Sequence, residues 1–372
     1  MKDRIVIGTR GSALALWQAD LVAESLRETY GGADAGGLRV ETKIIKTTGD
    51  KITDVALSKL GDKGLFTKEL ELALLDEDVD ICVHSMKDLP TVLPDGLCLP
   101  VMLERADVRD VIVATGDIAR ACADAAGEGR SAIEAIPAGA RIGTSALRRL
   151  AQLRLVRSDI EFANLRGNLD TRINKVVAGD VDAAILASAG IARMGWTEHI
   201  CAYIDTADML PAVGQGAIGI EARADDADTL GLILPLNHAA TFECVGAERD
   251  VMRVLDGGCQ TPFAAYARYV DDVHVASRHS ASREASLDRH SASREAAAQN
   301  PTHTPDTETL RQNGSDAPAQ IELRALVASV DGTRVLRASR TGHDAASIAR
   351  EVSDELLAAG AAEIMEQARA VA

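Results

Sequence analysis

The sequence lacks any run of eighteen or more apolar residues, which predicts that no segment spans a membrane. No secretory signal precedes the strand-like pattern that begins at Arg4, so we expect a cytoplasmic protein. C-x-x-C pairs are absent as well: the six cysteines are scattered along the chain, which argues against a disulfide framework and a structural zinc site. Basic residues are too few to balance the acidic ones, 40 against 56, and the net charge of −16 argues against nucleic acid and membrane surfaces as partners.

Several signatures of common enzyme classes are also missing. The sequence has no Walker A loop, no dinucleotide-binding fingerprint, no H-E-x-x-H and no G-x-S-x-G. What is present is ample apolar material, 47% of 372 residues, which can form packed cores. A chain of this length exceeds one ordinary core, so we expect two or three domains.

The first half of the chain alternates strand-like and helix-like segments, a pattern typical of mixed, mainly parallel sheets with helices on both faces. Ser12 is expected to cap the first helix, whose apolar residues recur at three- to five-residue steps. The expected strands are 4–8, 40–45 and 80–83, and a second helix is expected over 67–76. The pattern then starts again, since 141–147 echoes 7–14 and 181–188 echoes 79–85. Two related α/β lobes that face each other across a cleft explain both echoes.

The last third of the chain has a different character and predicts a small α+β domain. A helix is expected over 247–255, a hairpin over 321–330 and 334–340, and a helical tail over 345–370. Between these segments, the stretch 278–285 recurs as 289–296 and is followed by a polar tract. Because such a segment has no apolar core of its own, we expect residues 277–318 to form a disordered or loosely helical insertion.

Arginines stand at the starts of predicted helices in both lobes. They are Arg10, Arg148, Arg149, Arg166 and Arg172. A cation in the first turn opposes the helix dipole, so it is a poor structural choice unless it faces an anion. Surface ion pairing explains any one of them. Five at turns of two matching lobes indicate a cleft for a polycarboxylate, which guanidinium groups bind bidentately.

The segment Val83–Pro90 follows an expected buried strand, where α/β proteins place ligands. It carries His84, Ser85, Lys87 and Asp88 within five residues. An ordinary polar turn would explain one such group. Four different hydrogen-bonding or ionisable groups in one turn favour a catalytic role.

Cys259 follows two glycines in the segment Leu255–Pro262, on a bare loop rather than within an apolar run. A cysteine in that setting is a candidate nucleophile or covalent anchor. Its spacing alone leaves these two roles open.

Together these segments resemble the porphobilinogen deaminase (hydroxymethylbilane synthase) family. The matching stretches occur in order over residues 4 to about 268, at 8–19, 61–71, 83–90, 143–149, 165–168, 210–217 and 257–260. Residues from 321 match in pattern only, and the insertion at 277–318 departs from the usual family length. The resemblance implies two periplasmic-binding-protein-like lobes and a small α+β third domain. The expected boundaries are 1–105 with 215–236 for domain 1, 106–214 for domain 2 and 237–372 for domain 3.

The resemblance also implies an activity. Members of the family condense four porphobilinogen molecules head to tail, with loss of ammonia, and hydrolyse the product to hydroxymethylbilane for tetrapyrrole (porphyrin and heme) biosynthesis. Cys259 would carry a dipyrromethane cofactor through a thioether. Asp88 would be the catalytic group, because a carboxylate can assist departure of the amine, stabilise the cationic azafulvene and receive the released proton. The family implies a monomer, and no metal is expected.

Further site residues follow from the resemblance, position by position. The implied cofactor-binding residues are Ser85, Lys87, Asp88, Thr144, Ser145, Arg148, Arg149, Arg172 and Gly190. The implied substrate-binding residues are Arg10, Ser12, Gln18, Arg166 and Arg193. Lys59, Lys63 and Phe66 would belong to a lid over the site.

The main alternative is a non-enzymatic two-lobe protein that binds polycarboxylates, since a fold does not determine a function. That interpretation leaves the Gly-Gly-Cys loop and the Ser-Met-Lys-Asp turn unexplained. A weaker alternative is a transferase with a cysteine nucleophile. It requires a base near Cys259, where the local sequence offers only Gln260.

Overall fold

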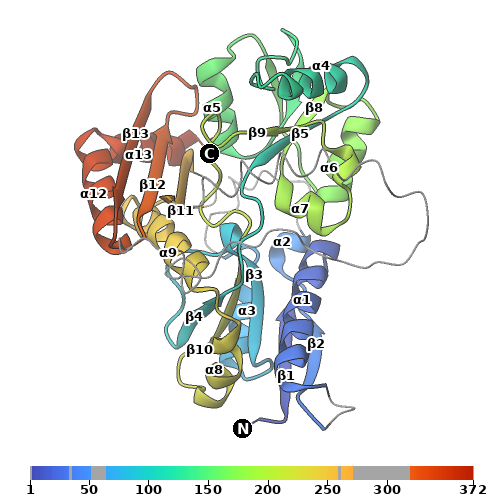
Figure 1. Cartoon of the computed structure of the whole chain (residues 1–372), viewed down its shortest axis with the longest axis vertical. Helices are drawn as coiled ribbons and strands as arrows, with labels where there is room; N and C mark the ends of the chain where they lie inside the picture. The colour runs from blue at the N-terminus through green and yellow to red at the C-terminus, as the bar shows by residue number, and fades with distance from the viewer. Residues whose placement is uncertain (1, 33–35, 52–63, 259–260, 271–318, 372) are drawn as a thin grey trace.

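The computed structural model describes residues 2–32, 36–51, 64–258, 261–270 and 319–371. The described chain forms two α/β lobes, one above the other in Figure 1, with a third α+β unit beside them. This arrangement of two five-stranded mixed sheets and one small sheet confirms the predicted fold class. The predicted insertion at 277–318 lies outside the described residues.

The first lobe is built on a five-stranded sheet of order β2-β1-β3-β10-β4. Its strands are β1 (Arg4–Thr9), β2 (Arg39–Ile44), β3 (Ile81–Ser85), β4 (Leu97–Met102) and β10 (Ile218–Arg223). Helices α1 (Ala13–Tyr30) and α8 (Ala227–Ile233) pack on the face that carries Ile5 and Ile7. Helix α3 (Lys68–Leu75) packs on the opposite face, against Val6, as the two-residue period of a strand requires.

The second lobe repeats this topology with the order β7-β6-β8-β5-β9. Its strands are β5 (Asp110–Ala114), β6 (Arg141–Gly143), β7 (Glu161–Ala163), β8 (Ala183–Ala187) and β9 (Ala202–Ile204). Its helices are α4 (Gly116–Gly127), α5 (Leu147–Val156), α6 (Leu169–Val177) and α7 (Ser188–Arg193). The repeated order accounts for the two sequence echoes.

The antiparallel strand of each sheet comes from a crossover between the lobes. β5 follows the first crossover and runs antiparallel to β8 and β9, and β10 follows the second and runs antiparallel to β3 and β4. The other pairings, β1 with β2 and β3 and β6 with β7 and β8, are parallel. In each sheet one strand therefore runs against the other four, which agrees with the predicted mixed, mainly parallel sheets.

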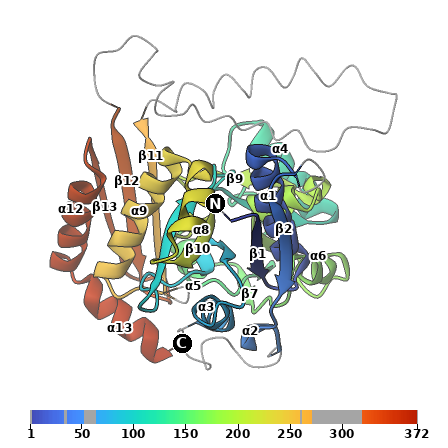
Figure 2. The same cartoon turned by 90° about the horizontal axis from the view of Figure 1, so that it is seen from below.

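The third unit is an antiparallel sheet of order β11-β12-β13 that is covered on both faces. Its strands are β11 (Phe263–Tyr269), β12 (Ile321–Ala328) and β13 (Val335–Gly342). Helices α9 (Ala239–Val254), α12 (Ala345–Ala358) and α13 (Ala361–Val371) pack on one face, and Figure 2 shows all three beside the strands of this sheet. The other face, through Ala264, Leu326 and Ala328, packs against Ala151 of α5 in the second lobe.

Two helix boundaries differ from the sequence-based prediction. Helix α9 begins at Ala239, eight residues before the predicted start, where the His238 ring accepts a hydrogen bond from the Thr241 N–H and caps the helix. The predicted tail is two helices, because Gly360 adopts a φ of 95° that ends α12.

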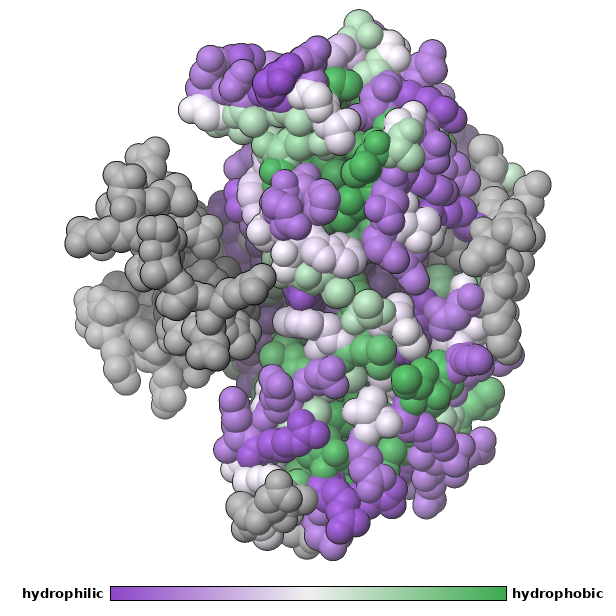
Figure 3. Space-filling model, turned by 90° about the vertical axis from the view of Figure 1, so that its right-hand side faces the viewer, coloured by the Kyte–Doolittle hydropathy of each residue, from purple (hydrophilic) through white to green (hydrophobic). Residues whose placement is uncertain are grey.

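The described surface is mixed in character. Figure 3 shows that one side of the molecule is mostly hydrophilic, with apolar residues in separate patches. Within the described residues, no helix is both long and apolar enough to cross a bilayer.

Candidate active site

The strand β3 leads directly into the turn that carries Asp88. After Ser85 the chain forms a single 3-10 turn, Met86–Asp88, which is anchored by the fully buried Met86 side chain. Asp88 itself is exposed and faces a pocket. That pocket is also lined by Arg10, Ser12, Gln18, Phe66, His84 and Ser85. The structure therefore brings Asp88 together with four residues that the sequence analysis assigned to substrate or lid.

Two side chains of this pocket are held by buried polar partners. The amide of Gln18, on α1, donates to the Ser85 hydroxyl over 2.8 Å. His84 Nε2 lies 2.9 Å from a carboxylate oxygen of Glu221 on the neighbouring strand β10, and both side chains are buried. These contacts hold Gln18, Ser85 and His84 in fixed orientations around Asp88.

Arg10 lies at the edge of the same pocket and already has an anionic partner. Its guanidinium forms an ion pair with Asp50 of the short helix α2 (Thr48–Lys51) and lies 4.2 Å above the Phe66 ring. Asp50 in turn accepts a hydrogen bond from the Thr47 hydroxyl at 2.8 Å. Burial raises the pKa of Asp50, but hydrogen bonds from Arg10 and Thr47 outweigh it and lower the pKa. Asp50 was not recognised in the sequence.

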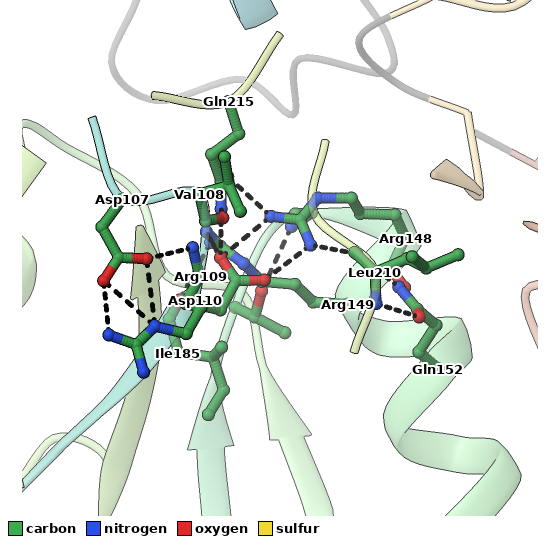
Figure 4. A network of polar contacts seen from close by, with 12 residues as sticks. Asp107, Val108, Arg109, Asp110, Arg148, Arg149, Gln152, Ile185, Leu210 and Gln215 are labelled. Atoms are coloured by element: carbon green, nitrogen blue, oxygen red, sulfur yellow. Dashed lines mark hydrogen bonds and ion pairs between the residues drawn. The ribbon is translucent and has the colours of Figure 1, made fainter. Parts of the chain in front are cut away.

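Arg148 and Arg149 converge on one buried carboxylate, Asp110, the first residue of β5 (Figure 4). Arg148 donates to both oxygens of Asp110, at 2.6 and 3.0 Å, and Arg149 donates to one, at 2.8 Å. Gln215, in the second crossover, donates to Asp110 at 2.9 Å and accepts from Arg148 at 2.9 Å. Burial raises the pKa of Asp110, but the charges of the two arginines hold it well below its usual value.

The anion that faces these two arginines at the start of α5 is thus a side chain of the protein itself, Asp110. Arg148 also donates to the Leu210 carbonyl at 3.1 Å, and Arg149 donates to the Ile185 carbonyl at 2.9 Å. Of these two arginines, Arg149 alone retains a buried nitrogen, Nε, with no hydrogen-bond partner among the described residues. Asp110 was missed in the sequence, although it was visible there as a carboxylate that opens the apolar run Val111–Ala114.

Positive charge also gathers around Lys87 and Arg172. Burial lowers the pKa of the Lys87 ammonium to about 8; Asp88 opposes this shift, and the charges of Arg149 and Arg148 add to it. Burial and the charge of Arg149 likewise lower the pKa of Arg172 to about 10, again against Asp88. These groups therefore share one electrostatic environment, in which an added carboxylate would be stabilised.

Arg193, at the end of α7, bridges the two lobes. It donates to the Gly216 carbonyl at 2.6 Å, and its guanidinium lies 5.7 Å from the Trp17 ring of α1. Burial lowers its pKa to about 10. A second, small pocket lies beside Arg193 and is also lined by Ser85, Lys87 and Gly190.

The remaining predicted polar residues contact other groups of the protein. Ser12 caps α1 by accepting the Ala15 N–H at 3.3 Å, as predicted. Thr144 accepts the Ala146 N–H at 3.3 Å, and the Ser145 hydroxyl donates to Asn164 at 2.6 Å. Arg166 is partly buried ahead of α6 and lowers the pKa of Arg172 through its charge. Lys59, Lys63 and Cys259 lie outside the described residues.

Two family models match the chain. One is described as "Porphobilinogen deaminase, dipyromethane cofactor binding domain" and matches residues 5–231, and the other is the C-terminal domain of porphobilinogen deaminase and matches residues 242–276. The chain is similar to the porphobilinogen deaminase of Syntrophobacter fumaroxidans, with 42% identity over 99% of both chains. It is also similar to that of Desulforudis audaxviator, with 41% identity over 100% of this chain and 99% of the other. A third relative, from Syntrophomonas wolfei, is 48% identical over 76% of this chain and 85% of its own.

Proposed function

The chain belongs to the porphobilinogen deaminase family, a family of transferases of tetrapyrrole biosynthesis with a dipyrromethane cofactor, and from this we propose how its own residues carry out the reaction. Four porphobilinogen molecules are joined head to tail with loss of ammonia, and hydrolysis releases hydroxymethylbilane. The observation that carries the proposal is the position of Asp88, exposed in a pocket beside a cluster of cations. The non-enzymatic alternative is not favoured, because the matched family is one of enzymes.

The charge of the site fits the proposed cofactor, whose pyrroles carry acetate and propionate groups. Lys87 and Arg172 are cations whose charged forms are disfavoured by burial and by neighbouring arginines. Such groups gain stability from added carboxylates, which remove the repulsion between them. We assign cofactor carboxylates to Ser85, Lys87, Thr144, Ser145, Arg149 and Arg172, beside Gly190. We include Arg148 in this set because of its position at the start of α5. Its guanidinium charge is already compensated in part by the ion pair with Asp110.

The cofactor is anchored, in this proposal, through a thioether to Cys259. Helix α9 ends at Val254, and the chain reaches Cys259 five residues later. The Gly257 N–H donates to the Met252 carbonyl at 2.8 Å, which holds the start of this segment against the helix. When bound, the cofactor supplies the free pyrrole α-carbon to which the first substrate is joined.

Asp88 is the catalytic residue of the proposal. Its carboxylate stabilises the positive charge that develops on the substrate pyrrole as the C–N bond to ammonia breaks. Once the new C–C bond has formed, the carboxylate would receive the proton that leaves the pyrrole α-carbon joined to the substrate, and it would pass this proton to solvent or to the ammonia already released. The hydrogen bond between Gln18 and Ser85 holds these two side chains in place at the pocket of Asp88.

The substrate carboxylates are assigned to Arg10, Arg166 and Arg193, together with Ser12 and Gln18. Arg10, Ser12 and Gln18 line the pocket of Asp88, and Arg193 lines the second, small pocket. Phe66 lies under Arg10 and, with Lys59 and Lys63, forms the proposed lid. The predicted domain boundaries at 105/106, 214/215 and 236/237 are part of the proposal. So are a cytoplasmic location, a monomeric state and the absence of nucleic acid and membrane partners.

The intact mass of the purified protein tests the anchor. We expect the wild type to exceed its sequence mass by two deaminated porphobilinogen units, and Cys259→Ser to lack this excess. Asp88→Asn should keep its fold and lose nearly all formation of hydroxymethylbilane. An unmodified wild type that gains no mass with porphobilinogen would refute the anchor, and normal turnover by Asp88→Asn would refute its catalytic role.

A further inference from the structure

The turn that carries Asp88 packs against helix α9 of the third unit. Val245 of α9 lies in one buried apolar cluster with Met86 and Leu89, the residues on either side of Lys87 and Asp88. One helical turn further along α9 lies Arg249, on the same side of the helix. Its guanidinium donates to the Leu89 carbonyl at 3.1 Å and to the Pro90 carbonyl at 2.6 Å.

These two carbonyls belong to the residues that follow Asp88 directly. Pro90 has no N–H and cannot continue a regular hydrogen-bond pattern, so the carbonyls at this point need partners from elsewhere. Arg249 supplies both from a largely buried position, with 8% of the residue exposed. A planar guanidinium that bonds two consecutive carbonyls restricts the peptide planes on which the orientation of Asp88 depends.

The same helix also fixes the opposite side of the turn. Glu248, fully buried, accepts the Gly214 N–H at 2.7 Å. Gly214 has a φ of 67°. A Cβ at this position would lie 2.7 Å from Met86 Cβ and 3.4 Å from the backbone nitrogen of Lys87. The Asp88 turn is therefore enclosed between Gly214 and α9, and adjacent residues of α9 hold both sides.

We propose that Arg249 is a positioning residue that sets the orientation of the Asp88 carboxylate relative to helix α9. This inference rests on the proposed catalytic role of Asp88. Asp88 acts in every condensation, so a displaced turn slows all four additions alike, whereas the loss of a carboxylate-binding arginine slows the addition that uses it.

The test compares Arg249→Met, Arg249→Lys and the control Arg253→Met in the cofactor-loaded enzyme, with loading measured by intact mass. Methionine keeps an apolar stem and removes all donors, and lysine keeps the charge and a single donor group. Arg253 lies on the same helix, exposed, and pairs with Asp250. We expect Arg249→Met to lower kcat roughly ten- to hundredfold with KM within about twofold, and Arg249→Lys to recover part of that loss. Arg253→Met should match the wild type.

Mass spectrometry of the enzyme during turnover separates positioning from substrate binding. In Arg249→Met, the proportions of enzyme with one, two and three added units should equal those of the wild type, at a lower overall rate. Wild-type kcat in fully loaded Arg249→Met, or a block at one addition, would overturn the inference. If Arg249→Met does not fold, Arg249→Lys decides: wild-type kcat overturns the inference, and a lower kcat at unchanged thermal stability supports it. If Asp88→Asn loses turnover but Arg249→Met keeps the wild-type kcat, the positioning role of Arg249 is rejected and the catalytic role of Asp88 stands.

Discussion

Asp110 offers the sharpest test of how the second lobe is held together. The carboxylate is fully buried and accepts hydrogen bonds from Arg148, Arg149 and Gln215. Replacing it with asparagine keeps the size of the side chain and removes the charge that compensates two buried guanidinium groups. Breaking a buried ion pair by removing one partner costs about 3–5 kcal/mol. We expect Asp110→Asn to lower the free energy of unfolding by about this amount.

The pH of the measurement follows from the pKa of Asp110. Its pKa is lowered in the folded protein, so the stabilisation is fully present above the unfolded-state value of about 3.9 and is lost as the pH falls toward the folded-state value. Urea unfolding at pH 7, followed by circular dichroism, therefore measures the whole contribution.

A matched exposed ion pair serves as the control for Asp110. Asp117 pairs with Arg120, and the two side chains are 93% and 75% exposed. We expect Asp117→Asn to change the urea midpoint very little, because exposed pairs contribute about 0–1 kcal/mol. The reasoning fails if Asp110→Asn unfolds within about 1 kcal/mol of the wild type, since the two arginines would then be compensated by other groups.

Three further predictions follow from contacts around the site. The rate at which apoprotein assembles its cofactor from porphobilinogen, followed by intact mass, should fall as the pH rises through about 8, because Lys87 loses its proton there. Lys87→Arg should remove this fall in rate. The same pH dependence in Lys87→Arg would contradict the assignment. Asp50→Asn should lower KM for porphobilinogen by up to about fivefold, because Asp50 competes with substrate for Arg10; an unchanged or higher KM would argue against that competition. Gly332→Ala should lower the free energy of unfolding by about 1–3 kcal/mol more than Gly129→Ala, measured by urea unfolding. Both glycines have a positive φ, but only at Gly332 would a Cβ meet Arg154 Cβ, at 2.5 Å. Equal losses would contradict this, because helix α5 would then have moved aside to make room for the new Cβ.

Much of the local structure could be predicted because it depends on neighbours in the chain. The strands at 4–8 and 40–45 and the helix at 67–76 match β1, β2 and α3 within about two residues. Ser12 caps α1 because its hydroxyl needs only the N–H three residues ahead. The early start of α9 was missed because His238 is not a residue that usually signals a helix start.

The candidate site was predicted only in part, because its partners come from distant segments. The arginines at helix starts were recognised from a local rule, that cations there should face an anion. The identity of that anion was not accessible, since Asp110 lies 38 residues before Arg148. Likewise Arg249 meets Leu89 across 160 residues of chain, and no periodicity in either segment records the contact.

The sequence by itself determined the family, the repeated α/β pattern of the two lobes and the chemical groups of the Val83–Pro90 turn, because motifs and periodicity are properties of consecutive residues. Only the tertiary structure decided which charges are compensated internally, as for Arg148 and Arg10, and which cations share the surroundings of Lys87. It also decided that α9 supports the turn of Asp88. The physical reason is that an ion pair or a buried hydrogen bond forms where packing brings two segments together, and packing depends on the whole set of apolar faces rather than on any one stretch of chain.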